Sequence, residues 1–318
     1  MIDTIHFNFN TDKPDLIKKQ FNKYSIHPVH RDNPIEAHVG GILNYKVTIR
    51  ENRVFVKGSL PKSAIGNNYT NMTISGIIEA IHNLRKIFGD EVLSAELTRL
   101  DLTLVVITDS PVPSYLTQML HYRWKSRFSY FESVYFKVKK GITITIYDKA
   151  AEMKKKKKRK EKITLEGNYL KYEVKIQNSI KKVLKKEQVL LTDLQEPIFY
   201  INLLSILEDT FGAIKKIEAP YPVNFYISSI VRLKEFKEFL VRWAVNQIGP
   251  AVLLELVEMG RLEKRILKEQ VCRMRNYIIS AAYVMNPAHE KLIPELKEKF
   301  YAATTDYKNQ IENYVHCP

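Results

Sequence analysis

A tyrosine and a lysine end an alternating segment, Gly-Ile-Thr-Ile-Thr-Ile-Tyr-Asp-Lys, at positions 141–149. A tyrosine hydroxyl attacks as the phenolate, and because its unperturbed pKa is about 10, it needs a neighbouring cation or base. Lys149 stands one strand repeat from Tyr147 and would supply that positive charge. Such a pair is ordinary on the polar side of a strand, so its interpretation depends on other residues.

Carboxylates occur on two other alternating segments, as Asp101 and Glu173. Two carboxylates can hold a hard divalent cation such as Mg²⁺ or Mn²⁺, which would polarise a phosphoryl group and stabilise charge on its oxygens. Glu152 is a further possible ligand. The third ligand stays open, because Asp148 alternates onto the isoleucine face of its segment and Glu96 onto the apolar side.

Three strands are expected to position these groups, at 95–107, 141–149 and 168–177, because apolar and polar residues alternate in each. If the strands join one sheet above a common core, Asp101, Tyr147 and Glu173 emerge on the same open side. Each residue taken alone is more often a solvated or cross-strand pairing residue. The pattern therefore leaves a catalytic face and a plain polar face both open.

The rest of the chain predicts an α+β protein. Further strands are expected at 2–9, 43–49, 54–60 and 130–138, and helices at 12–24, 73–88 and 113–122. From about residue 179 the spacing is helical, with segments at 197–216, 228–246, 251–259, 262–285 and 289–315. We therefore expect an antiparallel sheet domain at 1–180 and an all-helical DNA-binding or interaction domain at 181–318.

The chain is basic, with 50 Lys and Arg against 35 Asp and Glu and a formal charge of +15. This charge favours a polyanion such as nucleic acid as partner. The run at 154–162 holds eight bases and one acid, so it contributes 8 − 1 = 7 of the excess. It is expected to be an exposed segment that either contacts phosphates or is simply solvated. The candidate DNA-binding residues are Arg99, Lys154, Lys155, Lys156, Lys157, Lys158, Arg159, Lys160, Lys171 and Lys175.

Several function classes lack support in the sequence. It contains no Walker phosphate loop, GxGxxG, HExxH or GxSxG motif. Two cysteines are too few for a disulfide framework or a cysteine-based zinc site. No signal peptide or apolar run of about 18 residues is found, so we expect a soluble, cytoplasmic protein with no membrane partner.

Four motifs in order carry a resemblance to a known family. They are Met-Ile-Asp at 1–3, Thr-Arg-Leu-Asp-Leu-Thr at 98–103, Ile-Tyr-Asp-Lys-Ala-Ala-Glu at 146–152 and Leu-Lys-Tyr-Glu-Val-Lys-Ile at 170–176. Together they resemble the phage and plasmid replication initiators of the gene II/X family. These rolling-circle initiators of filamentous phages look related to the Rep_trans plasmid initiators. The similarity covers most of residues 1–180.

The resemblance implies a relaxase-like (HUH-like) nicking domain. In such enzymes a tyrosine attacks a phosphodiester at the replication origin and joins the 5′ phosphate, leaving a 3′ hydroxyl. Later strand transfer rejoins the DNA. Carried over by motif, Tyr147 is the nucleophile, Asp101 and Glu173 are metal ligands, Lys149 supports the attacking or leaving oxygen, and Glu152 is a further ligand. Expected partners are single-stranded or supercoiled origin DNA, with a host replication helicase or polymerase as a further candidate.

The sequence also departs from that pattern. Better-known HUH nickases bind metal through a His-hydrophobe-His triplet, which is absent here, so carboxylates must be the ligands. Tyr130 and Tyr135 are rival nucleophiles. Two alternatives remain: a noncatalytic DNA-binding protein, and a helical scaffold that binds a host factor.

Overall fold

The protein is described from a computed structural model. It describes residues 1–22, 24–28, 36–123, 125, 127–130, 132–139, 141–156, 165–216, 241, 245, 249–263, 265–282 and 291–316.

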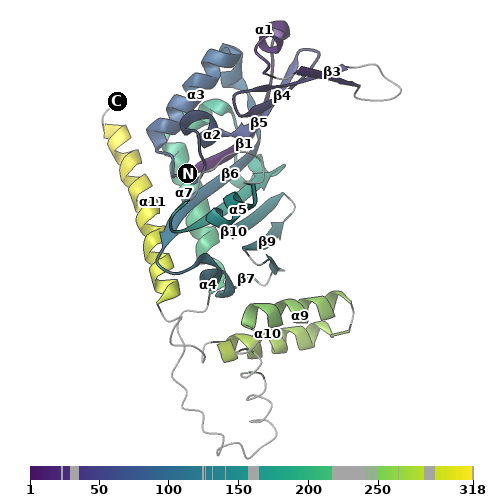
Figure 1. Ribbon diagram of the computed structural model, residues 1–318, viewed down its shortest axis with the longest axis vertical. Coiled ribbons are helices and arrows are strands. Elements are labelled where there is room, and N and C mark those ends of the chain that lie inside the picture. The colour runs from purple at the N-terminus through teal and green to yellow at the C-terminus, as the bar shows by residue number, and fades with distance from the viewer. Residues whose placement is uncertain are drawn as a thin grey trace, which may run out of the picture.

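A ten-stranded sheet forms the centre of the molecule, and all its neighbouring strands pair antiparallel. Its strands are β1 (Ile2–Asn10), β2 (Tyr24–Pro28), β3 (Glu36–Ile42), β4 (Tyr45–Arg50), β5 (Arg53–Ser59), β6 (Glu96–Thr108), β8 (Arg127–Tyr130), β9 (Ser133–Lys139), β10 (Ile142–Asp148) and β11 (Asn168–Gln177). The spatial order is β2-β3-β4-β5-β1-β6-β11-β10-β9-β8 (Figure 1). Strands β7 (Met119–Tyr122) and β12 (Ile214–Lys216) pair separately.

The helices are short before residue 190, apart from one. They are α1 (Pro14–Lys18), α2 (Leu60–Ile65), α3 (Ile74–Phe88), α4 (Val112–Thr117), α5 (Lys149–Lys156), α6 (Ile180–Leu184), α7 (Pro197–Gly212), α9 (Pro250–Leu262), α10 (Lys268–Ala282) and α11 (Leu292–His316). The long early helix, α3, has a clear start, because the Thr73 hydroxyl accepts a hydrogen bond from the Gly76 amide at 3.1 Å. It ends at Phe88 and is followed by Gly89, whose φ of 88° suits glycine.

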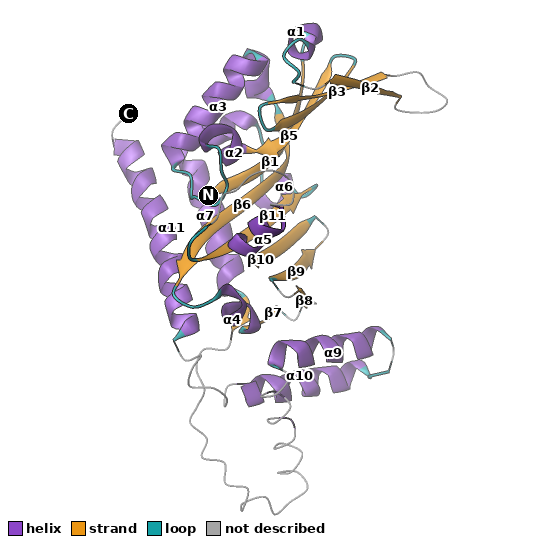
Figure 2. Ribbon diagram, viewed as in Figure 1, coloured by secondary structure: helices purple, strands orange, loops and turns teal. Residues whose placement is uncertain are grey.

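Helices α3, α7 and α11 pack against one face of the sheet and share its hydrophobic core (Figure 2). An aromatic cluster joins the last two to strand β11. The rings of Phe211 in α7 and Phe300 in α11 stack with centroids 3.8 Å apart, and Tyr172 of β11 meets both edge-on. Helices α7 and α11 are therefore part of the same body as the sheet.

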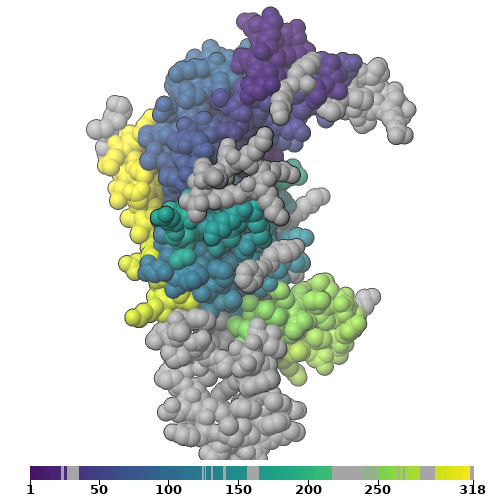
Figure 3. Space-filling model, viewed as in Figure 1, coloured from purple at the N-terminus to yellow at the C-terminus, as the bar shows by residue number. Residues whose placement is uncertain are grey.

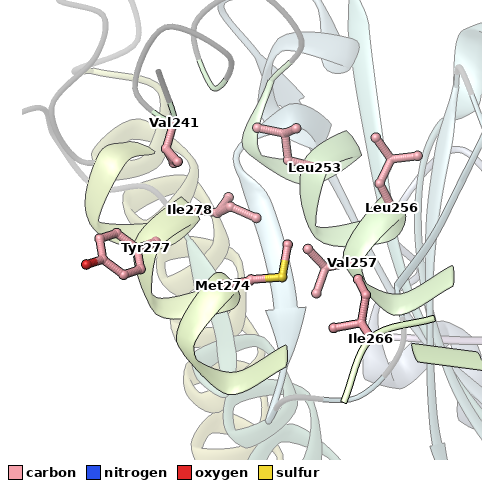
Figure 4. A pocket seen from close by; sticks show the side chains of 8 residues that line it. All are labelled: Val241, Leu253, Leu256, Val257, Ile266, Met274, Tyr277 and Ile278. Atoms are coloured by element: carbon pink, nitrogen blue, oxygen red, sulfur yellow. The ribbon is translucent and has the colours of Figure 1, made fainter. Parts of the chain in front are cut away.

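Helices α9 and α10 form a hairpin around a second apolar cluster, which also includes Leu120 of β7. It stands out from the main body in the space-filling view (Figure 3). Figure 4 shows side chains of both helices around an apolar pocket of about 370 Å³. The pocket is lined by Val241, Leu253, Leu256, Val257, Ile266, Met274, Tyr277 and Ile278.

The structure confirms an α+β protein with a large antiparallel sheet and helices in its C-terminal part. The boundary expected at residue 180 does not separate two hydrophobic cores, since α7 and α11 belong to the sheet's core. The helix expected at 113–122 ends at Thr117 and continues as β7, and the helix expected at 12–24 ends at Lys18. Most of the helix expected at 228–246 lies outside the described residues.

Candidate functional site

The antiparallel register places the three predicted residues on one open face of the sheet, opposite the helices α3, α7 and α11. Strands β6, β11, β10 and β9 are consecutive neighbours. Asp101 stands opposite Lys175, and Tyr147 stands opposite Lys171. Glu173 lies between Thr103 and Thr145. Residues directly opposite in a sheet share a face, so the adjacency that the sequence left open is present.

These side chains line a groove of about 450 Å³, to which Glu152 and Lys155 of α5 also contribute. Its lining residues are Asp3, Thr4, Ser59, Lys62, Asn68, Arg99, Asp101, Glu132, Ser133, Tyr135, Thr145, Tyr147, Asp148, Glu152, Lys155, Glu173 and Lys175. Six of these are acidic and four are basic. The groove is therefore acidic within a basic chain, and a phosphate entering it requires added positive charge or protons.

Asp101 is held by the guanidinium of its own strand neighbour. Arg99 donates from Nε to Oδ1 at 2.8 Å and from Nη2 to Oδ2 at 2.5 Å, a bidentate arrangement. Burial raises the pKa of Asp101 to about 6, with Arg99 opposing the rise and Glu173 adding to it. A buried carboxylate whose ionisation is also disfavoured by a neighbouring acid is a setting that a divalent cation stabilises.

The Tyr147 hydroxyl donates a hydrogen bond to Glu173 Oε2 at 3.4 Å. Burial is the main cause that raises the pKa of Tyr147 far above its ordinary value, and the charges of Glu173, Glu152 and Asp3 add to it. The Lys149 ammonium lies 6.0 Å from the Tyr147 ring centroid. In this arrangement the phenol is held neutral, and Glu173 is the group placed to accept its proton.

The end of the central strand differs from the expected alternation. Strand β10 stops at Asp148, whose Oδ1 accepts a hydrogen bond from the Ala151 amide at 2.9 Å and so caps α5. Lys149 is thus the first helical residue, not a strand residue, and its buried ammonium bonds Glu152 Oε2 at 2.6 Å. Asp148 stands opposite the buried Leu170, as the alternation predicts, and it also lines the end of the groove where the strand gives way to the helix.

Lys171 does not face solvent as the alternation of its strand predicts. Its ammonium is buried, forms an ion pair with Asp3, and donates to the Asn68 carbonyl at 3.2 Å. Asp3 also accepts from Ser59 Oγ at 2.5 Å and from Asn68 Nδ2 at 3.1 Å. Burial alone would raise the pKa of Asp3, but Lys171 together with the hydrogen bonds from Ser59 and Asn68 outweighs it and holds that pKa below its usual value. The loop that carries Asn68 therefore covers a residue predicted to contact DNA.

Other predicted DNA-binding residues lie around the groove or outside the described part. Lys154 is exposed, and Lys155 is exposed with its ammonium 2.7 Å from Glu132. Lys175 lies 3.2 Å from Glu173 Oε1. The side chain of Lys156 and all of Lys157, Lys158, Arg159 and Lys160 fall outside the described residues.

The rival tyrosines differ in what the structure shows. Tyr135 stands opposite Thr145 and lines the groove, whereas the side chain of Tyr130 lies outside the described residues. Tyr135 is therefore a natural comparison for Tyr147.

Two groove residues had no role in the predictions from sequence. Asp3 belongs to the Met-Ile-Asp motif at the start, but nothing local to that motif indicates the ion pair with Lys171. Thr145 is 2% exposed, and its hydroxyl has no hydrogen-bond partner among the described residues. An orphaned buried hydroxyl costs about 1–3 kcal/mol, which marks this point of the groove as a place where a ligand atom fits.

The oxygen donors of the groove suit a metal that needs few protein ligands. Within the described ranges, no group of three or more His, Cys, Asp or Glu side chains is arranged to hold a metal ion. Mg²⁺ commonly takes only one or two protein carboxylates and completes its shell with water and substrate phosphates. Asp101 and Glu173, with the orphaned Thr145 hydroxyl beside them, fit that smaller donor set.

Neither the comparison with protein-family models nor the comparison with curated proteins gives a match. Among the described residues, none of the helices has the length and apolar character needed to cross a bilayer. The function must therefore be inferred from the geometry of the groove.

Proposed function

We propose that this protein nicks origin DNA through Tyr147 and rejoins the strand, as an initiator of rolling-circle replication. The observation that carries the proposal is the hydrogen bond from the Tyr147 hydroxyl to Glu173, inside a groove that also holds Asp101. A nucleophile bonded to a base, with a second polar group oriented nearby, is the arrangement expected of covalent catalysis. The net charge of +15 supports a nucleic acid substrate.

The reaction assigns a task to each group. Glu173 takes the proton of Tyr147 as the phenolic oxygen attacks the phosphorus of a DNA phosphodiester. The bond from phosphorus to the 3′ oxygen breaks, and that oxygen takes a proton from solvent. The products are a 5′-phosphotyrosine and a free 3′ hydroxyl. In the reverse direction, a 3′ hydroxyl attacks the phosphotyrosine and releases Tyr147, which rejoins a strand without an external energy source.

Positive charge must offset the burial and the neighbouring acids that raise the pKa of Tyr147. Asp101 and Glu173 would hold Mg²⁺ or Mn²⁺, which supplies charge stabilisation to the phosphate oxygens. Arg99 keeps the Asp101 carboxylate oriented toward the groove. Lys149 keeps Glu152 at the α5 end of the groove, and Glu152 remains a candidate further ligand.

The test measures how much covalent adduct the protein forms with a supercoiled origin plasmid in the presence of Mn²⁺. Tyr147→Phe is expected to abolish the adduct, and Tyr135→Phe, from the same groove, is expected to keep it. Asp101→Asn and Glu173→Gln are expected to lose nicking and still retard DNA. If the Tyr147→Phe variant forms the adduct, another residue is the nucleophile. If both carboxylate variants nick DNA normally in the presence of chelator, Asp101 and Glu173 do not bind a catalytic metal.

A noncatalytic DNA-binding protein is the second candidate, favoured by the raised pKa of Tyr147. It predicts salt-sensitive DNA binding by the wild type without any covalent product under the same conditions.

A further inference from the structure

Four neighbouring strands beside the groove place basic residues in one line across the open face. Lys46 of β4 stands opposite Lys57 of β5, Lys57 opposite His6 of β1, and His6 opposite Arg99 of β6. We call these four residues the basic row. Because strands lie about 4.8 Å apart, the row crosses about 14 Å of sheet. It ends at Arg99, whose guanidinium holds Asp101 in the groove.

The basic row is costly for the fold alone. Like charges directly opposite each other destabilise a sheet, and both Lys46 and Lys57 are exposed. Among the described residues, neither lysine forms an ion pair with an acid. The local field is positive as well: the pKa of His6 falls to about 4, mainly by burial and then through Arg99 and Lys57. This surface is therefore built to meet negative charge.

An aromatic ring lies next to the basic row on the same face. Phe55 of β5 is half-buried, and the guanidinium carbons of Arg50 and Arg53 lie 5.7 and 5.3 Å from its centroid. These two arginines also stand directly opposite each other. Proteins bind single-stranded nucleic acid with cations that contact the phosphate backbone and with aromatic rings on which the bases stack.

We propose that the basic row and Phe55 hold a single strand of DNA that leads into the Tyr147 groove. Phosphates contact Lys46 and Lys57, and a base packs against Phe55 and the guanidinium planes beside it. The choice of DNA as the polyanion rests on the proposed function. The position of the strand rests on the cross-strand register, which connects the row to Asp101 through Arg99.

The first experiment measures binding of a fluorescein-labelled oligothymidylate by anisotropy across a salt series, in full-length protein carrying Tyr147→Phe. Lys46→Gln with Lys57→Gln is expected to reduce the slope of log affinity against log salt by about 1.4, or about 0.7 for each phosphate that is no longer neutralised. The melting temperature of this double variant is expected to stay at the wild-type value or to rise, because a like-charge pair is removed.

The matched control removes two exposed lysines, Lys86 of α3 and Lys182 of α6, whose helices contribute to the core on the other face. Lys86→Gln with Lys182→Gln changes the net charge equally and is expected to leave the slope near the wild-type value. Equal slopes for the two double variants would overturn the proposal.

A second variant tests the aromatic contact. Phe55→Leu is expected to weaken oligothymidylate binding roughly 5-fold to 150-fold while keeping the salt slope, because stacking carries no counterion release. Equal weakening for a duplex of the same length would overturn the single-strand assignment.

The two proposals fail separately. If the wild type forms no adduct but the lysine variant loses salt slope, the DNA surface stands and the nicking function fails. If the adduct forms and the slope is unchanged, the surface proposal fails.

Discussion

The two halves of the sheet's open face treat charge in opposite ways. Around β6, β11 and β10, charged groups are buried and paired, as in the ion pairs of Arg99 with Asp101 and Lys171 with Asp3. Around β4 and β5, cations are exposed and stand opposite one another, as Lys46 does to Lys57. A buried pair fixes geometry, whereas an exposed unpaired cation attracts a mobile polyanion. Under the two proposals, one face therefore combines a rigid reaction site with a binding surface.

The largest expected effect comes from removing one partner of a buried ion pair. Lys171→Met leaves the Asp3 carboxylate buried without its cation, so the free energy of unfolding should fall by about 3–5 kcal/mol. Lys57→Met, on the exposed half, should change it by less than about 0.5 kcal/mol. Urea unfolding of both variants measures the difference. Similar losses would mean that the two halves do not differ in how they use charge.

The next effect depends on pH. The folded pKa of Asp101, about 6, lies above its unfolded value of 3.8, so the folded state binds the extra proton between these values. Its contribution to stability is full below about pH 4 and is lost as pH rises through 6, amounting to about 3 kcal/mol. The free energy of unfolding of wild type minus that of Asp101→Asn should fall by that amount from pH 4 to 7. A constant difference contradicts the buried acid.

A smaller effect concerns the orphaned hydroxyl. Thr145→Val keeps the side-chain shape and removes a buried polar atom without a partner, so it should stabilise the protein by about 1 kcal/mol. If that hydroxyl serves a ligand, adduct formation should decrease while stability rises. Thermal unfolding and the adduct assay, run on the same preparation, check both. A destabilised variant would show that the hydroxyl has a structural partner.

The smallest expected effect comes from replacing one cation of the exposed half with an acid. Lys57→Glu places an acid opposite Lys46 and should raise the free energy of unfolding by about 0.2–1 kcal/mol. DNA affinity should fall at the same time, because a phosphate contact is replaced by repulsion. Chemical denaturation combined with anisotropy distinguishes this outcome from a purely structural effect, in which only stability would change.

Alternation in the sequence predicted which face each site residue occupies, because side-chain direction is a local property of a strand. It placed Asp101, Tyr147 and Glu173 on one face but could not show that β6, β11 and β10 are neighbours, since register is set by long-range pairing. Local patterns failed where another segment intervenes: Lys171 is covered by the loop carrying Asn68. The basic row was also missed, because its members come from four strands.

The stack of Phe211 on Phe300 has a consequence for how the chain can vary. It fastens α7 and α11 to each other within the main body, although the α9–α10 hairpin separates them in sequence. The hairpin is therefore an insertion between two points that the body already holds. Because closing a longer loop costs only about 0.6 kcal/mol for each doubling of its length, such an insertion tolerates exchange or enlargement. In evolutionary terms, a change in the hairpin must keep an acid for the buried Arg127 of β8, which pairs with Glu255 of α9.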